Sequence, residues 1–172
     1  MAKQNVSEIK TGADSSGSQM KGDSPFSAPI VYVQPEFEEL QRRFPIYVDP
    51  GYNGKRLDPI ERCKGVSMEN REVAFEYVHM GRYALTAEVL AEMDRKGLRP
   101  ALYEELLGFA LKYPDEQWKY PIVALGSEMF VDGYRLIACV WFDDVGRGLD
   151  LFFADDEDDN LTSLYRFLAV HE

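Results

Sequence analysis

The stretch PIVALGSEMFVDGYRLIACVWF (residues 121–142) contains two apolar segments separated by a turn signal. Its first part, PIVALG, is short and wholly apolar, which is typical of a buried strand. Asp132-Gly133 is a favoured two-residue turn, so SEMFVDGYRLIACVWF predicts a β-hairpin. The segments LDLFF (149–153) and YRFLAV (165–170) predict two more strands. We therefore expect a C-terminal antiparallel strand meander.

Three segments before this stretch have apolar residues at helical spacing. We expect the first helix over about 68–79, with Ser67 as its N-cap. The second is expected to begin at Thr86, as its N-cap, and to stop at Gly97. The third is expected over about 101–113, where Pro114 ends it. Because the helices precede the strands rather than alternate with them, the order predicts an α+β fold.

The N-terminal part of the chain divides into a polar head and a more apolar region. Residues 1–25 have almost no apolar side chains to bury, so we expect a disordered tail. From Phe26 on, IVYV (30–33) predicts a strand and PEFEELQRRF (35–44) a helix. PIYVDPGYNG then predicts a strand that ends in a turn, and residues 50–66 are expected to be irregular.

The chain is strongly acidic, with a formal charge of −11. The excess lies near the C-terminus, where residues 143–172 contain nine carboxylates against Arg147 and Arg166. A surface of this charge repels nucleic-acid phosphates and anionic lipids. The composition therefore argues against nucleic-acid and membrane partners and suits either solubility or a basic partner.

Two cysteines, Cys63 and Cys139, are too far apart in sequence to suggest a disulfide framework. Cys139 lies in the apolar run LIACVWF and is expected to be a buried, unreactive thiol. The chain has no apolar leader of the secretory kind and no run of about 18 apolar residues that could span a membrane. We therefore expect a reducing, cytoplasmic location.

Five consecutive carboxylates, Asp155 to Asp159, lie between two apolar runs. An EF-hand calcium loop that began at Asp155 would need Gly at its sixth position and Glu at its twelfth, where this chain has Asn160 and Arg166. Adjacent carboxylates repel one another least in water, so we expect a solvated loop between strands. A loose calcium site remains the alternative.

No motif assigns a catalytic residue, a metal site or a cofactor. The segment GYNGKR (51–56) lacks the Ser or Thr of a phosphate-binding loop. His79 and His171 have no nucleophile at a diagnostic spacing, and the cysteines and histidines are too few for a zinc site. Paired carboxylates for acid–base catalysis stay open, because Asp and Glu are abundant.

The aromatic residues near the C-terminus adjoin acidic ones. In a strand, Trp141 and Phe142 must point to opposite faces, as must Phe152 and Phe153. One member of each pair could then stand on a surface among carboxylates, as in protein-binding patches. The candidate ligand-binding residues are Trp141, Asp143, Asp144, Phe152, Asp155, Asp156, Asp158, Asp159 and Tyr165.

The chain from about Ala84 to Val170 resembles the C-type lectin fold in its formylglycine-generating-enzyme-like branch. The resemblance rests on GLRPALYEELLGFALKYP, a Gly-x-Arg segment that leads into a Glu- and Leu-rich helix, and on PIVALGS, DGYR, GRGLDLFF and the closing YRFLAV. Within that branch it is similar to the variable proteins of diversity-generating retroelements. The resemblance implies a lectin-like domain over 84–172, on which residues 26–83 pack as an N-terminal extension.

The resemblance implies a non-enzymatic binding module for a protein ligand. The Trp-Asn-Asp motif of calcium-dependent sugar-binding lectins is absent, and the cysteines do not reproduce the catalytic pair of the formylglycine-generating enzyme. Two alternatives remain. One is a metal-dependent or carboxylate-based enzyme, and the other is an acidic charge-mimic inhibitor of a nucleic-acid-binding partner.

Overall fold

A computed structural model describes residues 26–30, 47–48, 57–67, 69, 71–154 and 163–172. The expected tail (1–25), most of the strand 30–33, the expected helix 35–44 and the acidic run 155–159 lie outside these residues. Within them the protein is a mixed α/β protein with two α-helices and nine strands. In this part of the chain, neither helix has the length and apolar character needed to cross a membrane.

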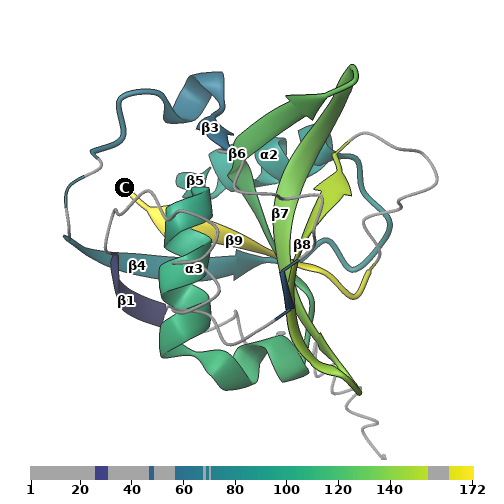
Figure 1. The fold of residues 1–172 in the computed structure, drawn as a ribbon. Helices are drawn as coiled ribbons and strands as arrows, with labels where there is room; N and C mark the ends of the chain where they lie inside the picture. Colours follow the sequence, from purple (N-terminus) through teal and green to yellow (C-terminus); the bar gives the residue numbers. More distant parts are fainter. Residues whose placement is uncertain (1–25, 31–46, 49–56, 68, 70, 155–162) are drawn as a thin grey trace, which may run out of the picture.

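The elements follow one another as shown in Figure 1. They are β1 (Phe26–Ile30), β2 (Tyr47–Val48), β3 (Asp58–Pro59), the 3-10 helix η1 (Glu61–Cys63), β4 (Arg71–Val78), α2 (Thr86–Arg95), β5 (Leu98–Pro100), α3 (Tyr103–Lys112), the 3-10 helix η2 (Pro114–Trp118), β6 (Ile122–Val131), β7 (Tyr134–Asp143), β8 (Gly146–Phe153) and β9 (Arg166–His171).

Seven of the described strands form one hydrogen-bonded path in the order β1-β4-β9-β6-β7-β8-β2. The two short strands β3 and β5 pair with β6 and β9 beside this path. The register between β6 and β7 shifts between Ala124 and Met129, where β6 turns to pair with β3. The sheet therefore joins segments from both halves of the chain, and β4 lies in the same sheet as β9.

The two helices cover opposite faces of the sheet, with α3 in front and α2 behind in the view of Figure 1. Side chains alternate between the two faces along each strand. On β6, Ile122 and Ala124 join the core beneath α3, whereas Val123 and Leu125 join the core beneath α2. We call these the α3 face and the α2 face.

The hairpin predicted from Asp132-Gly133 is confirmed. Asp132 has φ 51° and Gly133 has φ 88°, so both central residues occupy the left-handed region that a type I′ turn requires. Strand β8 pairs antiparallel with β7 from Leu136–Phe153 to Asp143–Gly146. The expected antiparallel meander is therefore present over β6, β7 and β8.

The expected helix at 68–79 is wrong, because residues 71–78 form strand β4. Its inward residues Val73, Phe75 and Tyr77 alternate with outward ones and pack beneath α3. Ser67 is not an N-cap, because a strand and not a helix follows it; its hydroxyl accepts a hydrogen bond from the Glu69 amide. The segment REVAFEYV has the period of a strand and many β-branched and aromatic residues, and burial of one face decides its structure.

The last strand also departs from the predicted meander. β9 does not follow β8 at the edge but lies between β4 and β6, antiparallel to the first and parallel to the second. Its residues Phe167 to Val170 are all buried, since helices cover both faces of the sheet at that point. A central strand of this kind has a continuous apolar sequence, which by itself does not indicate its neighbours.

The two later helices are confirmed, with small changes at their ends. Thr86 is the first residue of α2 rather than its N-cap, and its hydroxyl donates to the Ala154 carbonyl at 2.5 Å. The Glu88 carboxylate instead accepts from the Leu85 amide at the start of the helix. After α2, Gly97 has φ 69° and provides the left-handed residue that ends many helices.

Candidate functional site

The C-terminal end of β8 carries aromatic pairs on both faces of the sheet. Phe152 stacks with Tyr165 at a centroid distance of 5.9 Å and an interplanar angle of 21°. Phe153 makes an edge contact with Tyr134, with centroids 5.2 Å apart. The alternation of adjacent strand residues brings Phe152 to the α2 face and Phe153 to the opposite one.

Three of the predicted site residues, Trp141, Phe152 and Tyr165, lie on the α2 face and are half-buried. We call them the aromatic face. All three pack against the core beneath α2 while keeping part of each ring exposed. Asp150 lies on the same side of β8 between Phe152 and the position opposite Trp141, so it adds a carboxylate between the rings. The sequence did not single out Asp150.

The position of Trp141 depends on a glycine. Gly148 is its cross-strand partner on β8, and a Cβ atom added there would lie 2.3 Å from the indole ring. Because Gly148 has only a hydrogen where other residues have a Cβ atom, the indole ring of Trp141 can lie across strand β8. This contact holds Trp141 flat against the sheet, with one face of the indole covered.

Hydrogen bonds fix the chain at both ends of the segment that contains the acidic run. Before it, the Ala154 amide donates to the Arg135 carbonyl at 2.8 Å and its carbonyl accepts from Thr86. After it, the carbonyl of Ser163 lies 2.6 Å from Nε2 of His79, which must donate because a carbonyl only accepts. Ala154 directly follows Phe153, and Ser163 precedes Tyr165 by two residues, so in sequence the acidic run lies between members of the two aromatic pairs.

Of the predicted acidic residues that the structure describes, Asp143 and Asp144 lie away from the Phe152–Tyr165 pair, although Asp143 follows Trp141 by two residues on β7. Asp143 lies at the β7–β8 turn, where its carboxylate accepts hydrogen bonds from the amides of Val145 and Gly146 at 2.8 and 3.1 Å. Asp144 is exposed in the same turn. This turn is at the opposite end of β8 from Phe152. Asp155, Asp156, Asp158 and Asp159 lie outside the described residues.

The two cysteines are both buried, as predicted for Cys139. Burial, and then the neighbouring Asp150 carboxylate, raises the pKa of the Cys139 thiol well above its usual value. Burial also raises the pKa of Cys63 to about 11, although the nearby Arg99 guanidinium acts in the opposite direction. Both thiols therefore stay protonated near neutral pH. Covalent catalysis by a cysteine needs the deprotonated thiolate instead.

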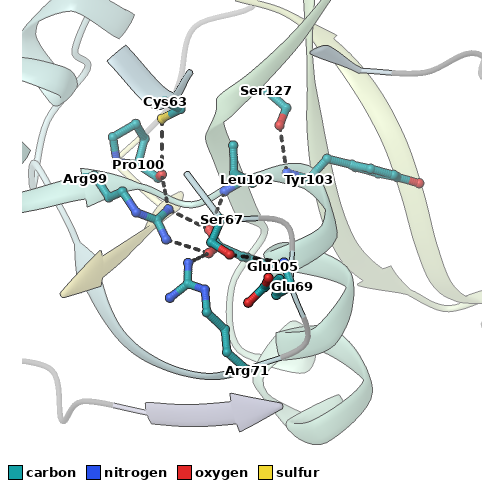
Figure 2. Close-up of polar contacts among 10 residues, drawn as sticks. All are labelled: Cys63, Ser67, Glu69, Arg71, Arg99, Pro100, Leu102, Tyr103, Glu105 and Ser127. Carbon is teal, nitrogen blue, oxygen red and sulfur yellow. Dashed lines mark hydrogen bonds and ion pairs between the residues drawn. The ribbon is translucent and has the colours of Figure 1, made fainter. Parts of the chain in front are cut away.

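A buried ion cluster, shown in Figure 2, lies where β5 leads into α3. Glu105 is completely buried, and its carboxylate accepts two hydrogen bonds from Arg99, at 2.6 and 2.7 Å, and one from Arg71 at 3.1 Å. It also accepts from the Leu102 amide at 2.8 Å, so it caps the helix. The cluster links β4, β5 and α3.

The contacts of the ion cluster are typical of a structural group rather than of a ligand-binding site. The Arg99 side chain is buried together with Glu105, and both Glu105 oxygens are engaged by groups of the protein itself. Sequence reasoning noted Arg99 only as part of the Gly-x-Arg segment and missed Glu105. The available signal was a Glu at the third helical position, where a carboxylate often caps the helix start.

Compared with protein-family models, with curated proteins and with solved structures, the chain has no significant match. Within the described ranges, no group of three or more His, Cys, Asp or Glu side chains is placed to hold a metal ion. The chemistry of the surface itself is therefore the basis for assigning a function.

Proposed function

We propose that the protein is a non-enzymatic binding module that presents its aromatic face to a protein ligand. One observation carries this proposal. Trp141, Phe152 and Tyr165 come from three separate segments, and folding brings their half-exposed rings to one face, with the Asp150 carboxylate between them. Protein interfaces are enriched in such aromatic residues, which provide large rigid contacts.

The ligand that suits this surface is basic. The formal charge of −11 attracts a cationic partner at long range, and in sequence five carboxylates lie between Phe152 and Tyr165. Electrostatic attraction of this kind speeds association, while the buried part of the rings determines how long the complex lasts. A cytoplasmic location is part of the proposal.

The proposed architecture is an α+β, C-type-lectin-like domain over residues 84–172 that is related to the variable proteins of diversity-generating retroelements. It is supported by the segment Gly97–Arg99 before a Glu- and Leu-rich helix and by the closing strand YRFLAV. The DNA beside the coding sequence tests this relationship. A reverse-transcriptase gene and a near-copy of the C-terminal coding segment are expected, and the absence of both would contradict it.

Affinity capture with the full-length chain tests the binding function. We expect proteins retained by the wild type to be lost from a Phe152→Gln/Tyr165→Gln variant and kept by a Leu111→Gln variant. Leu111 is a matched control because it is an exposed apolar residue on α3, away from the aromatic face. Equal retention by the aromatic-face variant and the wild type would overturn the proposal. If that retention also disappears at high salt, the charge-mimic alternative is favoured.

A further inference from the structure

Strand β8 is paired along only part of its outer edge. The short strand β2 pairs with Gly148 and Leu149, whereas the pairing of β8 with β7 continues as far as Phe153. Within the described residues, no strand therefore lies along β8 from Asp150 to Phe153 on the side away from β7, and Figure 1 shows β8 continuing past β2. An unpaired strand edge presents backbone N–H and C=O groups that a further strand can satisfy.

The direction of these backbone groups follows from the neighbouring hydrogen bonds. The Ala154 amide donates inward to the Arg135 carbonyl of β7, so the amide and carbonyl of Phe153, the residue before it, point outward. Leu151, two residues earlier on β8, has the same orientation, and its amide donates to the Asp150 carboxylate at 2.8 Å in place of a strand. In the described part of the chain, the Leu151 carbonyl and the amide and carbonyl of Phe153 are therefore left for a further strand.

Aromatic rings lie on both sides of this free edge. Phe153 lies on the α3 face, is 37 % exposed and makes an edge contact with Tyr134 of the same face. Phe152 lies on the α2 face and belongs to the aromatic face. Because side chains alternate along a strand, an added strand places successive side chains beside Phe153 and beside Phe152. Both neighbours are apolar, so the edge suits a segment with adjacent apolar residues.

We propose that the free edge of β8 binds an extended segment of the protein ligand as an added β-strand, an inference that rests on the proposed function. The main chain of the segment hydrogen-bonds with Leu151 and Phe153, and its side chains pack beside the rings of Phe152 and Phe153. In this mode of recognition, main-chain hydrogen bonds provide affinity and alternate side chains provide specificity. A second copy of this chain is disfavoured as the occupant, because two chains of formal charge −11 repel each other.

The test uses short random linear peptides displayed on phage and the full-length chain. Peptides are selected on the wild type after removal of those that bind a Phe153→Pro variant. Proline has no amide hydrogen and is tolerated where a strand N–H faces outward, so this variant removes one donor of the edge. We expect enrichment of peptides with adjacent β-branched or aromatic residues. If no peptide is enriched, the inference is overturned.

Two controls separate main-chain pairing from ring contacts. Phe153→Ala removes the ring and keeps the amide, so it is expected to bind an enriched peptide roughly threefold more weakly than the wild type, against roughly tenfold or more for Phe153→Pro. The second control is the same peptide with N-methyl groups on two adjacent amides, which keeps the side chains and removes a donor from each edge. It is expected to bind the wild type roughly tenfold more weakly. If Phe153→Pro does not fold, the N-methylated peptide carries the test, together with the ¹⁵N amide shift of Phe153 in the wild type, which the unmodified peptide is expected to change in a saturable way.

Equal affinities of Phe153→Pro and Phe153→Ala, or an N-methylated peptide that binds as tightly as the unmodified one, would overturn the inference. Sedimentation of the wild type is expected to show a monomer. A dimer that Phe153→Pro abolishes would also overturn it, because a second copy would then occupy the edge.

The aromatic-face variant Phe152→Gln/Tyr165→Gln distinguishes this failure from failure of the proposed function. If only the aromatic-face variant loses the enriched peptide, the present inference fails and the proposed aromatic face stands. If only Phe153→Pro loses it, the inference holds and the proposed aromatic face fails. Loss from both variants supports both.

Discussion

The two faces of the sheet use the same kinds of side chain in different ways. On the α3 face, Phe109 is fully buried, and the rings of Phe26, Phe75, Tyr77 and Tyr113 surround it at centroid distances of 5.0–5.7 Å. On the α2 face, Trp141, Phe152 and Tyr165 keep part of their rings exposed. Aromatic content thus does not identify a binding surface, because the extent to which a helix covers the face decides the role of each ring.

The largest expected effect is on the covered face. Phe109→Ala is expected to lower the free energy of unfolding by about 3–5 kcal/mol, because it opens a cavity among four packed rings. Phe152→Ala on the other face is expected to lower it by only about 1–2 kcal/mol, because its ring is already half-exposed. Chemical denaturation of both variants measures the difference, and equal losses would remove the distinction between the faces.

The ion cluster at the start of α3 gives the next effect. Glu105→Ala leaves the buried Arg99 guanidinium without its carboxylate and is expected to lower the free energy of unfolding by about 3 kcal/mol. Glu92→Ala is the control, since Glu92 pairs with Arg95 on the exposed side of α2 and should change stability far less. Similar losses in the two variants would show that burial does not determine how much these ion pairs contribute to stability.

A smaller effect is expected at the contact between Trp141 and Gly148. Gly148→Ala is expected to push the indole ring away and to lower the free energy of unfolding by about 1–2 kcal/mol, with a change in tryptophan fluorescence. The same substitution in a Trp141→Ala background should cost much less, because the clashing ring is gone. A cost that is unchanged by removal of Trp141 would place the strain in the backbone instead.

The smallest effect is a dependence of stability on alkaline pH. The pKa of Cys63 is raised by burial from 9.0 to about 11, so between these values the folded chain keeps a proton that the unfolded chain has released. The unfolded state is therefore favoured as the pH rises, and stability should fall across this window. Cys63→Ala should show a shallower fall than the wild type, and identical slopes would contradict the assignment.

Local signals predicted the elements whose structure depends on neighbouring residues. The hairpin turn at Asp132-Gly133 was predictable because both positions need positive φ, and the end of α2 was predictable from Gly97. The strand β4 was missed because its polar start resembles a helix N-terminus, whereas its structure comes from burial of Val73, Phe75 and Tyr77 against α3. The place of β9 between β4 and β6 depends on long-range pairing, which its apolar sequence does not encode.

The candidate site was predictable to a similar extent. Alternation along a strand predicted that Phe152 and Phe153 face opposite ways, and this is confirmed. It did not predict the exposure of Phe130 and Tyr134, because that depends on where β8 ends relative to β7. The pairing of Glu105 with Arg99 was missed because both residues are charged and so indicate a surface, whereas together they are stable in the interior.

Stability and binding measured in the same variants test the division between the two faces most directly. Binding is measured by affinity capture with the full-length chain, and the variants are Phe109→Leu and Phe152→Gln/Tyr165→Gln. The account predicts that Phe109→Leu lowers the free energy of unfolding by about 1–2 kcal/mol and retains the same proteins as the wild type. It predicts that the aromatic-face variant loses these proteins while remaining folded. Retention of these proteins by the aromatic-face variant, or their equal loss from Phe109→Leu, would contradict it.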